Sequence, residues 1–216
     1  LPGHDWPALI ERVLAVLPEP GWVVLPDALP ADLVAALREE LGARDAAGVL
    51  HAAGIGRGAA HQVRGSVRGD RIAWLQASWP AAARYLALMD SLRQALNQSF
   101  FLGLDEYEAH YACYEPGGFY RRHVDRHAGA ARDADARGQR VVSTVCYLNA
   151  PGWPADAGGE LVLYPEMGDD GRAAGVRVRP DGGTLVVFRS DDVPHEVLAA
   201  DRRRLSIAGW MRTRAG

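Results

Sequence analysis

Apolar positions follow a helical period in the first part of the chain. Between residues 6 and 17 they recur every three or four positions, which predicts an amphipathic helix that ends at Pro18. Four further elements are predicted before residue 100: short buried strands at residues 22–25 and 71–75, and helices at residues 30–41, closed by Gly42, and 80–96. We expect these elements to form a helical support.

From residue 101 onward the pattern changes to short extended runs separated by turns such as Glu115-Pro-Gly-Gly118 and Pro180-Asp-Gly-Gly183. The runs lie at residues 107–114, 119–125, 140–149, 159–164, 176–178, 183–188, 195–198 and 205–213. About eight short strands with this spacing predict a double-sheet jelly roll packed on helices. The sequence therefore predicts an α+β, mainly β fold: one domain over residues 1–216, with a double-stranded β-helix in residues 101–216.

A Gly- and Ala-rich stretch at residues 46–70 carries scattered Arg and His residues and no apolar period. An unpatterned stretch of this length in a compact domain is either a functional loop or disordered. His51 and His61 lie within it, and we interpret both as solvated loop residues rather than as ligands. A functional loop at this place would close over a site and help to select what enters it.

Length, charge and cysteine content narrow the class of protein. The chain has 216 residues, is 48% hydrophobic and carries a net charge of −3, which argues against a nucleic-acid binder that depends on phosphate contacts. It has no run of 18 apolar residues and no basic-then-apolar start, so we expect neither a membrane span nor a signal peptide. Its two cysteines form no paired motif, which favours a reduced, cytoplasmic setting. We expect a monomer.

His123 and Asp125 are one residue apart in an extended run, so their side chains point to the same face. Two histidines and one carboxylate make the facial triad of non-haem Fe(II) oxygenases, which leaves positions on the metal open. His195, which follows a strand-like run at residues 184–188, is the best candidate for the missing ligand. A His-x-Asp pair alone is a weak signal, because it often arises by chance.

Arg204 lies nine residues after His195 and begins an alternating run. The alternation places Arg204, Ser206, Ala208 and Trp210 on one face and Leu205, Ile207 and Gly209 on the other. All 24 basic residues are arginines, so a lysine Schiff base is excluded and any cation that binds a substrate carboxylate must be an arginine. A buried Arg204 with small neighbours suits a bound carboxylate, whereas we interpret Arg202 and Arg203 as solvated.

With the sequences around them, these residues resemble the 2-oxoglutarate- and Fe(II)-dependent dioxygenases. The matching segments are Ala112-Cys-Tyr-Glu-Pro-Gly117, His123-Val-Asp125, Tyr147-Leu-Asn149, Gly158-Gly-Glu-Leu161, Pro194-His-Glu-Val197 and Arg204. Within that family the chain is most similar to prolyl hydroxylases of the hypoxia-inducible-factor type and their bacterial homologues, from about residue 68 to residue 212. Arg at position 204 favours this branch, since collagen-type prolyl hydroxylases generally carry Lys there.

The resemblance implies roles for individual residues. The iron ligands would be His123, Asp125 and His195, and the distal carboxylate of 2-oxoglutarate would be held by Arg204 and Tyr147. The cosubstrate pocket would include Tyr114, Leu161 and Val145, and the target proline would lie near Tyr120, Arg140, Trp210 and Asp70. Ala208 departs from a threonine that is common in relatives, so a hydroxyl contact near the cosubstrate is either missing or supplied by Ser206 or Ser143.

The function that the resemblance implies is hydroxylation of a prolyl residue in a protein, with Fe(II), 2-oxoglutarate and O2 as requirements and ascorbate as an optional cofactor. Succinate and CO2 would be released. The partner would be a protein with a target proline, such as a translation elongation factor, with no nucleic acid or membrane involved. Two alternatives stay open: a hydroxylase of a free amino acid or other small molecule, and a metal-binding jelly roll without catalysis.

Overall fold

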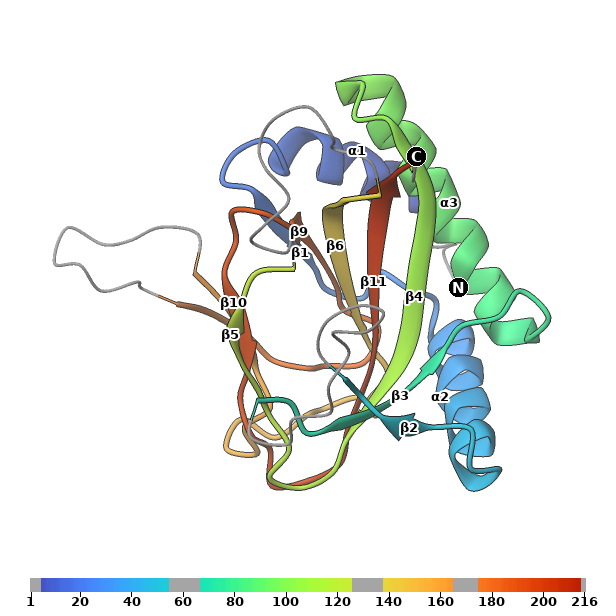
Figure 1. Ribbon diagram of the computed structural model, residues 1–216, viewed down its shortest axis with the longest axis vertical. Helices are drawn as coiled ribbons and strands as arrows, with labels where there is room; N and C mark the ends of the chain where they lie inside the picture. The colour runs from blue at the N-terminus through green and yellow to red at the C-terminus, as the bar shows by residue number, and fades with distance from the viewer. Residues whose placement is uncertain (1–4, 55–66, 126–137, 165–174, 215–216) are drawn as a thin grey trace, which may run out of the picture.

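The computed structural model describes residues 5–54, 67–125, 138–164 and 175–214. Within these ranges, three helices lie against one face of a large sheet (Figure 1): α1 (Trp6–Val16), α2 (Ala31–Ala46) and α3 (Pro80–Phe100). None of the helices in the described ranges has the length and apolar character needed to cross a membrane.

The described strands form two antiparallel sheets. The larger sheet has the order β1 (Trp22–Leu25), β9 (Leu185–Arg189), β6 (Arg140–Tyr147), β11 (Arg204–Thr213), β4 (Leu104–Tyr114), β3 (Asp70–Trp74) and β2 (His51–Ala52). The smaller sheet has the order β5 (Tyr120–His123), β10 (His195–Val197), β7 (Leu161–Leu163) and β8 (Val176–Val178). Strands distant in sequence are neighbours in both sheets, so the predicted double-stranded β-helix with supporting helices is confirmed.

Buried apolar side chains form two layers. One lies between the helices and the larger sheet and includes Leu37 and Met89, whereas the other lies between the two sheets and includes Leu161 and Phe188. Strand β11 separates them, because successive side chains of a strand point to opposite faces. Ile207 packs in the helical layer, and the pocket between the sheets is lined by Arg204, Ser206, Ala208 and Trp210. The alternation predicted for this strand is confirmed.

Some predicted boundaries are wrong. Helix α2 does not end at Gly42 but continues to Ala46, because a glycine ends a helix where its φ is positive and Gly42 keeps helical geometry. Helix α3 continues past residue 96 to Phe100, and Phe101 then turns the chain with a φ of 54°. The other predicted strands are found, with several ends shifted by a few residues.

The stretch before β3 was predicted to lack structure, and this is wrong at both of its described ends. The short strand β2 pairs with β3, and His51 is exposed there. Near β3 the chain also pairs with the smaller sheet, since the amide of Arg121 donates a hydrogen bond to the carbonyl oxygen of Val67. Residues 55–66, including His61, lie outside the described residues, and so does this middle part of the loop expected to select a substrate.

Glu40 joins α2, α3 and the larger sheet. Its carboxylate accepts hydrogen bonds from the backbone amides of Ala81 and Ala82, at 3.0 and 3.1 Å, in the first turn of α3. It also accepts a hydrogen bond of 2.7 Å from the hydroxyl of Tyr111 on β4. Trp79 precedes α3 and makes no side-chain capping bond, so Glu40 supplies the acceptor and the negative charge that a helix N-terminus favours.

We expect Glu40→Ala to lower the free energy of unfolding by about 2–3 kcal/mol, because two helix amides and a buried hydroxyl lose a charged acceptor. Denaturant titration of the two proteins measures the difference. The matched control is Glu39→Ala, which removes an exposed carboxylate one position earlier on the same helix. Equal losses in the two variants would show that Glu40 does not act as this cap.

Candidate metal centre

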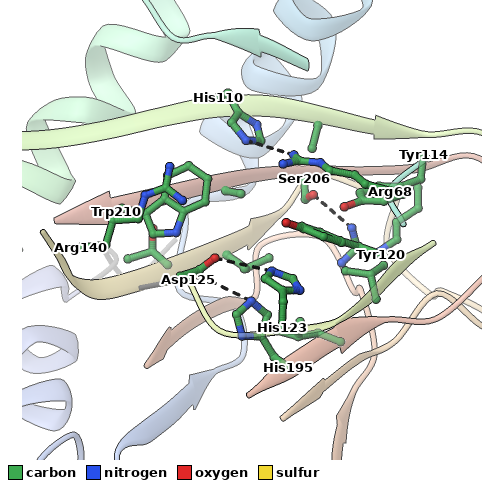
Figure 2. Close-up of a pocket in the computed structure, with 17 residues that line it drawn as sticks. Arg68, His110, Tyr114, Tyr120, His123, Asp125, Arg140, His195, Ser206 and Trp210 are labelled. Carbon is green, nitrogen blue, oxygen red and sulfur yellow. Dashed lines mark hydrogen bonds and ion pairs between the residues drawn. The ribbon is translucent and has the colours of Figure 1, made fainter. Parts of the chain in front are cut away.

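Two histidines and an aspartate meet in the gap between the two sheets. His123 ends β5 and His195 begins β10, and the two are paired across these antiparallel strands. Asp125 lies just beyond β5 rather than within it as predicted. Ligand atoms of all three residues lie within 4.8 Å of one another (Figure 2). The structure thus brings together the three residues that the resemblance named as ligands.

Backbone carbonyl groups orient both imidazole rings. Nδ1 of His123 lies 2.7 Å from the carbonyl oxygen of Arg121, and Nδ1 of His195 lies 3.1 Å from that of Val193. Because a carbonyl oxygen only accepts hydrogen bonds, each Nδ1 carries the proton and each Nε2 keeps a lone pair. Both Nε2 atoms lie 3.6 Å from carboxylate oxygens of Asp125. Two lone pairs and a carboxylate therefore converge on one point.

The charges of these groups suit a metal ion. Burial alone would raise the pKa of Asp125, but His195 and His123 hold it well below its usual range. Burial lowers the pKa of His195. The carboxylate is therefore charged and the His195 ring neutral, the states in which both bind a metal. This donor set fits a non-haem Fe(II) ion with positions left open.

Arg204 is fully buried on β11, and only 1% of its surface is exposed. Its Nε donates a hydrogen bond of 2.8 Å to the carbonyl oxygen of Gly159, and its Nη1 donates one of 3.2 Å to Oγ of Ser206. Its Nη2 has no hydrogen-bond partner in the described part of the chain, and no described carboxylate forms an ion pair with Arg204. A buried charge without a counter-charge is costly, so this guanidinium fits a carboxylate brought by a ligand.

The residues expected around the cosubstrate surround this arginine. The rings of Tyr114 and Tyr147 each lie 5.1 Å from its Cζ, and Val145 and Leu161 line the same pocket. Burial raises the pKa of Tyr147 to about 12, so its hydroxyl keeps its proton; that hydroxyl has no hydrogen-bond partner among the described residues. An unpaired donor thus lies beside the unpaired Nη2 of Arg204, which strengthens the fit to a carboxylate.

The four residues expected near the target proline lie in different surroundings. Tyr120 stacks on His123 with ring centres 3.7 Å apart, and Arg140 lies over the ring of Trp210 at 3.5 Å (Figure 2). Those three line the pocket that contains the metal ligands. Asp70 is instead buried at 3% exposure and held by Arg68 through two hydrogen bonds of 2.5 and 2.8 Å. It lies behind Arg68, which is itself a lining residue.

Sequence reasoning missed His110, a buried lining residue on β4. Its Nε2 lies 3.4 Å from Nη2 of Arg68 (Figure 2). Its ring contacts Trp74 and Trp210, with centroids 5.2 and 5.4 Å away. Its Nδ1 lies 3.1 Å from the carbonyl oxygen of Tyr111, which makes Nδ1 the protonated nitrogen and Nε2 the acceptor. The strand period could have found it, because His110 shares the pocket face of β4 with Ala112 and Tyr114.

Known proteins share the fold and the sequence features of this chain. The model of the 2OG-Fe(II) oxygenase superfamily matches residues 109–212. Egl nine homolog 1 of Rattus norvegicus is 33% identical over 152 residues, which are 67% of this chain and 41% of that protein. Egl nine homolog 1 of Homo sapiens is 31% identical over 153 residues, 67% of this chain and 33% of that protein. The chain thus spans less than half the length of these relatives.

Solved structures are similar over nearly the whole chain. A prolyl-4-hydroxylase of Pseudomonas putida is 44% identical, with a TM-score of 0.81 over 94% of this chain and 99% of that one. A prolyl hydroxylase of Trichoplax adhaerens, in complex with a peptide fragment of the hypoxia-inducible-factor oxygen degradation domain, is 26% identical, with a TM-score of 0.79 over 96% of this chain and 90% of that one.

The burial of His110 leads to a prediction about how the free energy of unfolding depends on pH. Burial lowers its pKa from the ordinary 6.5 to about 3, with Arg68 and Arg140 adding to that effect and Asp70 opposing it. Below pH 6.5 the unfolded chain therefore binds a proton that the folded chain refuses, so the free energy of unfolding falls as the pH falls towards 3. Relative to His110→Gln, the wild type should lose up to about 1.4 kcal/mol per pH unit in this window.

Denaturant titration of the metal-free proteins at several pH values between neutral and acid measures this difference, in which effects of other groups cancel. The control is His51→Gln, because His51 is exposed on β2. Its pH dependence should match that of the wild type. A His110→Gln protein with the same pH dependence as the wild type would contradict the prediction.

Proposed function

Because the chain belongs to the 2-oxoglutarate- and Fe(II)-dependent oxygenases and within them is similar to prolyl hydroxylases, we propose that it hydroxylates a prolyl residue of a protein substrate. The coproducts are succinate and CO2. One observation carries the proposal: three converging metal-binding side chains line the same pocket as a buried arginine that has no counter-charge among the described residues. A structural metal site would have no use for that arginine.

His123, Asp125 and His195 would hold the iron by the Nε2 atoms of the rings and the carboxylate. When bound, Fe(II) with 2-oxoglutarate supplies the activation of O2, coupled to oxidative decarboxylation of the cosubstrate. The protein's part is to present the two rings and a charged carboxylate in fixed orientations. The carbonyl groups of Arg121 and Val193 orient the two rings.

Arg204 and Tyr147 would bind the carboxylate of 2-oxoglutarate that lies far from the metal. A guanidinium offers two parallel donors, and its orientation is already fixed by Gly159 and Ser206. Leu161 would exclude water around the aliphatic part of the cosubstrate. Because Arg204 and the metal ligands line the same pocket, an acid held at one end by Arg204 would meet the metal with its other end.

The open side of the pocket is suited to a polypeptide. Trp74 lies at the rim beside Trp210 and is 43% exposed, although a large aromatic ring is normally buried. Burial raises the pKa of Tyr120, so its hydroxyl stays protonated near the metal ligands and can donate a hydrogen bond. Aromatic rings offer flat apolar surface to a prolyl ring and its neighbours. A protein with an accessible proline, such as a translation elongation factor, is the substrate we propose.

Mass spectrometry of a cell lysate incubated with the enzyme, Fe(II) and 2-oxoglutarate tests the substrate class. We expect prolines in one or a few proteins to gain the mass of one oxygen atom. The control is the same incubation with Arg204→Ala. Turnover of free proline in preference to every protein in the lysate would replace this proposal with a small-molecule oxygenase.

Removal of one ligand should abolish tight metal binding, because each is one of three protein ligands. We expect His195→Ala and His123→Ala to lose Fe(II) binding and succinate formation while they unfold at the same denaturant concentration as metal-free wild type. Asp125→Asn should retain weak binding through its amide oxygen and lose most of its activity. Succinate formation by His195→Ala at the wild-type rate would remove that residue from the ligand set.

Arg204→Ala should weaken binding of 2-oxoglutarate by about 2–5 kcal/mol and leave the metal affinity unchanged, because a desolvated charge pair is lost. Arg204→Lys should fall between Ala and wild type, since a point charge replaces a two-pronged donor. Calorimetric titration of the Mn(II)-loaded proteins with 2-oxoglutarate measures the affinity of both variants for the cosubstrate. The control is Arg202→Ala, whose exposed side chain pairs with Asp201. If Arg204→Ala binds 2-oxoglutarate normally, another residue holds its carboxylate.

A further inference from the structure

We propose that Ser143 and Ser190 form a buried hydroxyl relay that positions Asp125 at the metal centre. This inference deepens the proposed function and rests on its metal site. Oγ of Ser143 donates a hydrogen bond of 2.7 Å to Oδ2 of Asp125, and Oγ of Ser190 lies 2.8 Å from Oγ of Ser143. The exposed fractions are 1% for Ser143, 0% for Ser190 and 8% for Asp125.

The direction of the relay follows from proton counting. A hydroxyl group has one proton to donate, and a carboxylate offers only acceptors. The proton of Ser143 therefore points to Asp125, and the contact between the two serines is made by the proton of Ser190. The relay runs from Ser190 through Ser143 to the carboxylate. Each hydroxyl polarises the next, which strengthens the bond that reaches Asp125.

The relay joins the two sheets at the metal centre. Asp125 lies beyond the end of β5 in the smaller sheet, where strand pairing does not fix its side chain. Ser143 lies on β6 of the larger sheet, and Ser190 directly follows β9, which pairs with β6. The two histidines are fixed by carbonyl groups near them in sequence, whereas the aspartate is fixed across the gap. The hydroxyl of Ser143 donates its proton to Asp125, so it does not replace the hydroxyl that is missing at Ala208.

The bond from Ser143 makes the two oxygens of Asp125 unequal. Oδ2 accepts the hydrogen bond from Ser143 and lies 3.6 Å from Nε2 of His195, whereas Oδ1 lies 3.6 Å from Nε2 of His123 and accepts no bond from Ser143. With one lone pair of Oδ2 used in this way, Oδ1 would be the oxygen that binds the metal. One-point binding by Asp125 would leave positions on the ion free for the 2-oxo acid and O2. Binding through both oxygens would remove one of them. The two serines are thus positioning residues that keep Asp125 bound by a single oxygen.

Titration with Co(II), a stand-in for Fe(II) that does not turn over, tests the relay without relying on activity. We expect Ser143→Ala to lower Co(II) affinity about 10- to 100-fold and to change the visible spectrum of the bound ion, which reports its coordination. Ser143→Thr, which keeps the hydroxyl, should restore both. Ser190→Ala should lower Co(II) affinity by less, because Ser143 still donates its hydrogen bond to Asp125 and loses only the bond that it accepts from Ser190.

The matched control is Ser206→Ala, which removes a buried serine hydroxyl that contacts Arg204 instead of Asp125. It should keep the affinity and the spectrum of Co(II). Ser143→Ala or Ser190→Ala with wild-type affinity and spectrum would overturn the relay, and if Ser143→Ala does not fold, Ser190→Ala and Ser143→Thr decide. A wild type that binds no Co(II) would overturn the metal site itself. A wild type that binds Co(II) but hydroxylates no proline would overturn the function and leave the relay.

Discussion

The charge of Arg204 is the constraint on which the arrangement of this pocket depends. Placing a guanidinium between two sheets removes it from water, and the described neighbours supply a carbonyl and a hydroxyl oxygen but no carboxylate. A buried charge of this kind is tolerated where a bound ligand supplies the opposite charge. Tyr114 and Leu161 line the same pocket as this guanidinium.

The two sheets contribute different parts of the site. The smaller sheet supplies the histidines through β5 and β10, and the larger one supplies Arg204 from β11 and the hydroxyl of Ser143 from β6. Neither sheet holds a complete site, so the chemistry depends on how the sheets face each other. The helices act indirectly, because their layer lies on the far face of the larger sheet and fixes its position.

Local periodicity was enough to predict much of this fold and part of the site. A period of two placed Arg204, Ser206, Ala208 and Trp210 on one face, since that pattern is decided within a single strand. The predicted end of α2 was wrong because nothing in the sequence around Gly42 distinguishes a glycine within a helix from a glycine that ends one. Contacts such as Ser143 with Ser190 join residues 47 apart, and no local pattern reveals which of many serines will meet.

The unequal strand lengths around the site have a consequence for local stability. β11 has ten residues, all paired with β4 and seven of them also with β6, whereas the strands that hold the histidines have four and three residues. Short ladders open at a lower free-energy cost than long ones, so amide hydrogen exchange in the metal-free protein should be faster around His123 and His195 than around Arg204. A metal that binds the closed form alone ties these strands together and slows exchange there in proportion to its free concentration. Bound iron would then stabilise the smaller sheet as well as serve as the cofactor.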